Sequence, residues 1–65
     1  MGLIEAAESG DIQSVRELLD RGADPDTRND YGSTALRYAL QRGHIEIVEL
    51  LLDRGADINL SLIHI

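Results

Sequence analysis

The sequence predicts an all-α fold of stacked helical repeats, and three observations support this prediction. The heptapeptide Leu-Leu-Asp-Arg-Gly-Ala-Asp occurs twice without change, at residues 18–24 and 51–57, an offset of 33 residues. Apolar residues in and before each copy recur with the period of an α-helix. The stretch from Ala23 to Ser33 is rich in Asp, Asn and Gly and holds the only Pro, which is typical of a loop. A fixed period of this length indicates units that bury their apolar faces against one another.

The first helix of each unit is predicted to be short. In the second unit Thr34 can cap its start, Leu36 and Ala39 lie along it, and Gly43 can close it. The small Ala39 would let the two helices of the unit approach closely. The offset places Leu3, Ala6 and Gly10 at the matching positions of the first unit.

The second helix of each unit has the clearer apolar face. Its residues follow the spacing i, i+3, i+6 and i+7 and are Ile12, Val15, Leu18 and Leu19 in the first unit and Ile45, Val48, Leu51 and Leu52 in the second. Asp11 stands where an N-cap carboxylate would accept backbone N–H bonds. Gly22 and Gly55 follow at positions where a left-handed glycine can end a helix. We therefore expect both apolar faces to lie in the core.

Residues 32–39, 43–52 and 55–59 together resemble one full ankyrin repeat, and the resemblance extends over residues 2–59. It implies an ankyrin-repeat solenoid, in which each repeat has paired antiparallel helices and a β-turn finger projects between repeats. The family's Thr-Pro-Leu-His element is here Thr34-Ala35-Leu36-Arg37. Arg37 donates hydrogen bonds but cannot accept one as a neutral imidazole does. We expect a somewhat weaker repeat with the same fold.

The two units differ in polarity, and this difference predicts their roles. Glu5, Ser14 and Glu17 of the first unit stand opposite the apolar Tyr38, Ile47 and Leu50 of the second. Terminal repeats of a stack carry polar residues on their outer face. We therefore interpret residues 2–28 as an N-terminal capping repeat, with Met1 a genuine start, and residues 29–59 as a full repeat that expects a further neighbour.

Residues 60–65, Leu-Ser-Leu-Ile-His-Ile, do not resemble a third repeat. The codons CTG TCT CTT ATA CAC ATC would encode them, and this string resembles a transposon-end adapter of sequencing libraries. On this hypothesis the tail is an artefact, and further ankyrin repeats follow Asn59 in the natural chain. The alternative is a short hydrophobic terminus that covers the open end of the stack.

Composition excludes several classes of function. The chain has 12 acidic and 6 basic residues, for a net charge of −6, so it would repel the phosphates of a nucleic acid. It has no basic n-region followed by an apolar run, and no stretch long enough to span a membrane. We therefore expect a cytoplasmic protein that binds neither nucleic acid nor membrane.

No pattern in the sequence predicts an enzyme, a metal site or a cofactor. Asp24, Asp26 and Asp30 suggest a calcium loop, but Arg28 and Ala35 occupy positions where an EF-hand needs oxygen ligands. There is no Cys. His44 has no accompanying nucleophile or paired carboxylate, so we interpret it as a structural residue of the turn between helices.

The remaining function is the binding of a protein partner. Ankyrin proteins usually hold partners with their fingers and inner helices, and the family's variable positions are here Asp30, Tyr31, Ser33, Gln41 and Arg42, with Glu8 and Ser9 in the capping repeat. Tyr31 is the strongest candidate for two reasons. Tyrosine is enriched at binding hot spots, and Tyr31 lies outside the helical pattern of apolar residues. Its alternative role is to pack against its own finger, and Tyr38 is expected in the core. Two other hypotheses stay open: an N-terminal regulatory segment of a larger enzyme, and a mini-protein that dimerises through its open end.

Overall fold

The computed structural model describes residues 2–58 and contains four helices in this range. They are α1 (Leu3–Ser9), α2 (Ile12–Asp20), α3 (Ala35–Arg42) and α4 (Ile45–Asp53). Within residues 2–58 the backbone forms no strand beyond one isolated antiparallel bridge between Arg28 and Thr34. The predicted all-α fold is confirmed. The tail at 60–65 and Asn59 lie outside the described residues.

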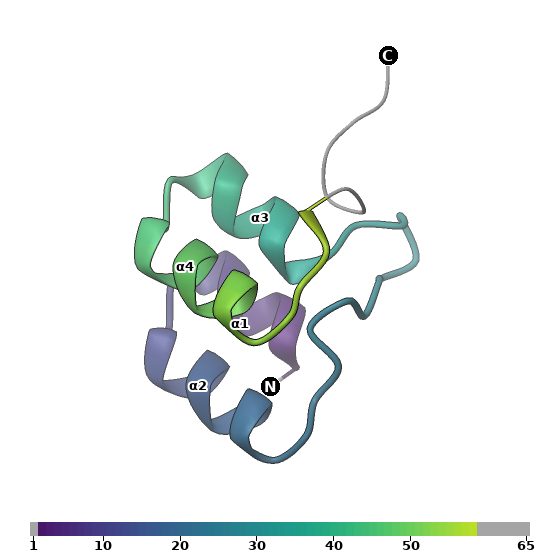
Figure 1. The fold of residues 1–65 in the computed structure, drawn as a ribbon. Helices are drawn as coiled ribbons and strands as arrows, with labels where there is room; N and C mark the ends of the chain where they lie inside the picture. Colours follow the sequence, from purple (N-terminus) through teal and green to yellow (C-terminus); the bar gives the residue numbers. More distant parts are fainter. Residues whose placement is uncertain (1, 59–65) are drawn as a thin grey trace.

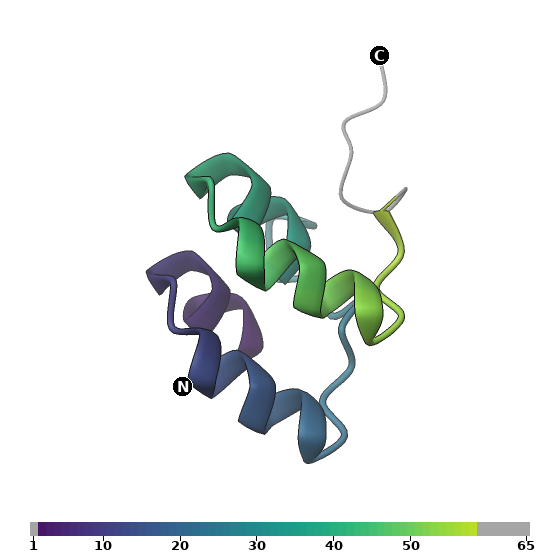
Figure 2. The ribbon, with the colours of Figure 1, turned by 60° about the vertical axis from the view of Figure 1, so that its left-hand side comes forward.

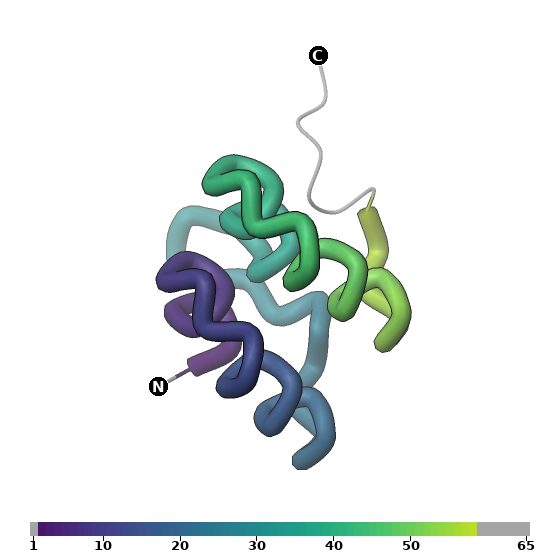
Figure 3. The backbone as a smooth tube through the Cα atoms, turned by 90° about the vertical axis from the view of Figure 1, so that its left-hand side faces the viewer, coloured from purple at the N-terminus to yellow at the C-terminus, as the bar shows by residue number. Residues whose placement is uncertain are grey.

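The helices form two pairs that stack on each other. Figure 1 shows α1 beside α3 in one layer and α2 beside α4 in the other. In Figure 2 the pair α1–α2, in purple and blue, lies directly beneath the green pair α3–α4. Figure 3 shows the same arrangement from a further angle, with α2 and α4 side by side. The segment between α2 and α3 runs along one end of the stack and carries the finger, which is the turn at residues 28–34.

The helix boundaries follow the predicted capping residues. The Asp11 carboxylate accepts hydrogen bonds from the Ser14 amide at 3.2 Å and from the Ser14 hydroxyl at 2.8 Å. The Thr34 hydroxyl accepts one from the Arg37 amide at 3.2 Å. Gly22 and Gly55 follow α2 and α4 with φ of 95°. Side-chain capping therefore marks the start of α2 and of α3, and a left-handed glycine follows the end of α2 and of α4.

Eleven buried apolar residues form the core among residues 2–58, and they come from all four helices. Val15, Leu36 and Leu51 are fully buried within it. The expectation that both apolar faces lie in the core is wrong for Ile45 and Leu52, which are 61% and 40% exposed. Ile47, outside that predicted face, is buried instead. The reason is that α4 packs on the first repeat with one side, and no described element covers its other side.

The capping of α2 predicts a specific dependence of stability on pH. Hydrogen bonds from the Ser14 hydroxyl, and then from the Ser14 amide, hold the pKa of Asp11 below its usual 3.8. A carboxyl whose pKa is lowered by folding stabilises the protein above its unfolded pKa and loses this effect as the pH falls through the folded value. We expect the urea midpoint of the wild-type chain to fall more steeply below about pH 5 than that of Asp11→Asn, which keeps a capping oxygen. Parallel curves for the two chains would contradict this assignment.

Candidate partner-binding surface

The finger between the repeats is a tight turn closed by a short ladder. Next to the Arg28–Thr34 bridge, the Asn29 amide donates to the Ser33 carbonyl at 3.0 Å. At the tip, the Gly32 amide donates to the Asn29 carbonyl at 2.9 Å, which is the hydrogen bond of a β-turn. Gly32 has a φ of 74°, which favours glycine at this position.

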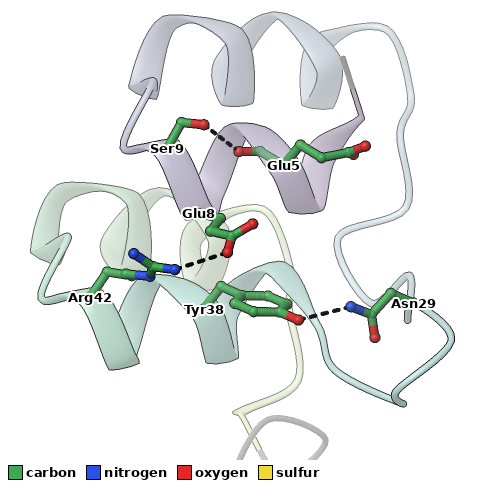
Figure 4. Close-up of polar contacts among 6 residues, drawn as sticks. All are labelled: Glu5, Glu8, Ser9, Asn29, Tyr38 and Arg42. Atoms are coloured by element: carbon green, nitrogen blue, oxygen red, sulfur yellow. Dashed lines mark hydrogen bonds and ion pairs between the residues drawn. The ribbon is translucent and has the colours of Figure 1, made fainter.

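The side chain of Asn29 organises this turn. Its Oδ1 accepts hydrogen bonds from the amides of Tyr31 and Ser33, each at 3.0 Å. Its Nδ2 donates to the hydroxyl of Tyr38 at 2.9 Å, and Tyr38 lies on α3 (Figure 4). The side-chain amide of Asn29 thus links the finger to α3, the inner helix of the second repeat. Sequence reasoning missed Asn29, although an Asn at the start of an Asn-Asp-Tyr-Gly turn is a known turn signal.

The finger presents Tyr31 to solvent. This side chain is 88% exposed, which contradicts the alternative that it packs against its own finger. Asp30 beside it is also exposed, whereas Ser33 is half-buried and its backbone forms part of the turn. Tyr38, expected in the core, is half-buried and uses its hydroxyl to hold Asn29.

The other candidate residues lie at the far end of the inner helices. The Arg42 guanidinium pairs with the Glu8 carboxylate at 2.9 Å, and the Ser9 hydroxyl donates to the Glu5 carbonyl at 2.8 Å (Figure 4). Both ionised side chains are about half exposed, and their opposite charges compensate each other. Gln41 is exposed beside Arg42. The pair joins α1 to α3, so it also links the two repeats.

The predicted site residues therefore form two groups. Asp30, Tyr31 and Ser33 lie just before the start of α3, and Gln41 and Arg42 lie at its end with Glu8 and Ser9 beside them. An eight-residue helix is about 12 Å long, which is the approximate separation along α3. A partner that contacts both groups must extend along the inner helix.

A groove of about 400 Å³ lies at the turns between the helices of each repeat, away from the finger. It is lined by Gly10, Ile12 and residues 43–47. The His44 ring lies against Gly10: a Cβ placed on Gly10 would be 2.8 Å from the ring's Cε1 atom. This contact fits the structural role inferred for His44. Among residues 2–58 no three His, Asp or Glu side chains are grouped to hold a metal ion.

A sequence model of the family described as "Ankyrin repeats (many copies)" matches residues 3–52. The chain belongs to the ankyrin-repeat family. The ankyrin repeat and SAM domain-containing protein 6 of Danio rerio is 49% identical over 39 residues, which is 60% of this chain. The matched part is only 5% of that relative's length. In the part of this ankyrin-repeat chain that the structure describes, no helix is long and apolar enough to cross a membrane.

The link between Asn29 and Tyr38 predicts that the hydroxyl of Tyr38 keeps the finger ordered. Tyr38→Phe removes the acceptor of the Asn29 amide and is expected to cost about 0.5–1.5 kcal/mol of stability. The amides of Tyr31 and Ser33 should then exchange faster with deuterium. Tyr31→Phe is the matched control because it deletes the hydroxyl of an exposed ring, and we expect a change within about 0.5 kcal/mol. Equal exchange rates in wild type and Tyr38→Phe would contradict the link.

Proposed function

We propose that this ankyrin-repeat chain is a non-catalytic module that binds a protein partner through its finger and inner helices, with Tyr31 as the principal contact. The observation that carries the proposal is the 88% exposed ring of Tyr31 on a finger whose backbone is held by Asn29. A Tyr ring offers a large amphipathic contact area and loses little conformational entropy when a partner covers it. Asp30, Ser33, Gln41, Arg42, Glu8 and Ser9 are proposed to contribute the polar rim.

The charges of this surface favour a particular kind of partner. Glu8 and Arg42 compensate each other, so the helix end has no net charge from this pair. Around the finger, Asp24 and Asp30 are exposed and Asp26 is half-buried, with Arg28 as the exposed cation among them. We propose a partner with a basic segment facing the finger, because complementary charge speeds encounter and suppresses wrong partners. Two expectations from the sequence stay predictions: that the protein is cytoplasmic, and that further repeats follow Asn59.

Tyr31→Ala tests the proposal directly. A partner captured with the wild-type chain is purified, and its affinity for wild type and variant is measured by calorimetry. We expect the variant to bind at least about 2 kcal/mol more weakly, which is roughly 30-fold, because Tyr hot spots reach this size. Glu49→Ala, an exposed position on α4, is the control and should bind as wild type does.

Urea unfolding of Tyr31→Ala separates binding from folding. The exposed ring makes no core contact, so the stability of the variant should stay within about 0.5 kcal/mol of wild type. Lost stability with unchanged affinity would refute the proposal. The alternative of a regulatory segment attached to an enzyme stays a prediction, and nothing in the described residues favours it.

A further inference from the structure

The groove at the turns between the helices takes its walls from both repeats. Gly10 and Ile12 line it from the first repeat, and residues 43–47 line it from the second. In Figure 1 these two turns lie on the left, at the opposite end of the helices from the finger. Its volume of about 400 Å³ falls within the range of clefts that bind ligands, about 300–1,000 Å³. The groove is therefore a candidate binding surface to which the finger contributes no residue.

Two aliphatic side chains line the groove at equivalent positions of the two repeats. Ile12 begins α2 and Ile45 begins α4. Ile12 is half-buried, and Ile45 is 61% exposed, which is more than any other aliphatic side chain among residues 2–58. An aliphatic side chain that packed against both would remove apolar surface from water, which is favourable.

The groove also offers two polar side chains. The His44 ring is half-buried with its Cε1 edge over Gly10, and its nitrogens have no hydrogen-bond partner within residues 2–58. Both nitrogens reach solvent, because no described side-chain N or O atom is buried without a partner. A neutral imidazole has one donor and one acceptor, so it can bind a peptide group. Glu46 is exposed and has no ion pair in the same part of the chain.

The charges around the groove favour a cation over an anion. Arg42 precedes the lining residues 43–47 in the chain, but it pairs with Glu8 at 2.9 Å, so these two charges compensate each other. Asp11 at the start of α2 is an exposed carboxylate, and no ion pair joins it to another described residue. The carboxylates of Asp11 and Glu46 therefore give this end of the molecule a negative potential.

We propose that the groove binds a short extended segment of a protein partner, in which an aliphatic side chain packs on Ile12 and Ile45 and an Arg or Lys pairs with Glu46. Successive side chains of an extended chain point to opposite sides, so one residue separates these two in the partner. A second copy of the chain fits poorly, because each copy carries a net charge of −6. The phosphates of a nucleic acid would meet the same repulsion.

A short peptide of this chemistry tests the proposal. The probe is acetyl-Gly-Leu-Ser-Arg-Gly-amide, which carries the aliphatic and the basic side chain at this spacing. The ¹⁵N-labelled chain is titrated with the probe at low salt, because salt screens exposed ion pairs. We expect saturable shifts of the amides of Gly10, Ile12 and residues 43–47, with a dissociation constant on the order of 1 mM. The amide of Tyr31 on the finger should not shift.

Matched changes of charge test the ion pair with Glu46. Glu46→Gln should raise the dissociation constant about threefold, which is the size of a typical exposed ion pair. Glu49→Gln removes the same charge from an exposed position of α4 that does not line the groove, and it should bind the probe as wild type does. A peptide with citrulline in place of arginine keeps the shape but not the charge. It should bind wild type and Glu46→Gln equally, because the interaction that the two changes share is already lost.

A conservative change tests the apolar contact. Ile45→Val removes one CH₂ group from an exposed side chain, so circular dichroism should show an unchanged fold. It should raise the dissociation constant for the probe by up to about fourfold, which corresponds to the burial of one CH₂ group. Tyr31→Ala should bind the probe as wild type does, so a failure of the proposed finger function would leave this result unchanged.

Four results would overturn the inference. The first is no saturable shift at about 5 mM probe while the chain is folded, because binding at the expected strength would be nearly complete there. The second is equal binding of the citrulline peptide and the probe to wild type, which would remove the ion pair. The third is a set of shifts at Tyr31 and Ser33 in place of the groove. The fourth is a shift of the groove amides when the chain alone is diluted, which would make a second copy the occupant.

Discussion

Replacing Leu51 by Ala is expected to unfold most of the chain at 25 °C, whereas the same change at the neighbouring Leu52 should leave it folded. Leu51 is fully buried between the helices, and removing a buried leucine side chain costs about 2–5 kcal/mol. A domain of this size rarely has more than about 3–5 kcal/mol of stability. Leu52 is 40% exposed, so its truncation removes fewer contacts. Loss of far-UV circular dichroism measures the unfolded fraction.

The first repeat provides the matched control because its two leucines lie in the same heptapeptide. Leu19 is buried and Leu18 is only half-buried, which reverses the order seen at Leu51 and Leu52. We therefore expect Leu19→Ala to be more destabilising than Leu18→Ala. Urea titrations in the presence of trimethylamine N-oxide would give a folded baseline for all four variants, because this osmolyte strengthens effective burial. A cost for Leu52→Ala equal to that for Leu51→Ala would contradict the stacking described above.

This reversal shows which parts of the fold the sequence could predict. The helices, their caps at Asp11 and Thr34 and the loop that contains Pro25 depend on local chemistry, and each was predicted correctly. Which of the two leucines in each heptapeptide is the more buried depends on the side on which the neighbouring repeat packs. That information is absent from the heptapeptide itself, so helical periodicity alone placed Leu52 in the core.

The candidate surface was predictable to a similar extent. The sequence predicts Tyr31 in a loop, because it lies among turn-forming residues and outside the helical pattern. The ring is exposed there. The ion pair of Glu8 and Arg42 was not predicted, although both residues were candidates. They lie 34 positions apart, close to one repeat length, so stacking brings them together. The hydrogen bond from Asn29 to Tyr38 could not be predicted, because it depends on how the finger is oriented relative to α3.

Gly10→Ala is expected to destabilise the chain by more than Gly43→Ala, although the two glycines occupy the same place in their repeats. Both end the first helix of a repeat with positive φ, 81° at Gly10 and 73° at Gly43. An alanine in this left-handed region costs about 1–2 kcal/mol at either position. At Gly10 the new Cβ would also lie 2.8 Å from Cε1 of His44, whereas a Cβ on Gly43 would have no described atom within 4 Å beyond its own chain neighbours.

The difference between the two variants measures how firmly His44 packs on the first repeat. Crowding in a packed site adds about 1–3 kcal/mol, so Gly10→Ala should leave little folded chain. Combining it with His44→Ala should recover this excess and leave the backbone cost shared with Gly43→Ala, and a double-mutant cycle would isolate the contact. Equal losses of stability in Gly10→Ala and Gly43→Ala would show that the His44 ring can move away from Gly10 at no cost. The stacking of the repeats would then depend on α1, α3 and the core rather than on this turn.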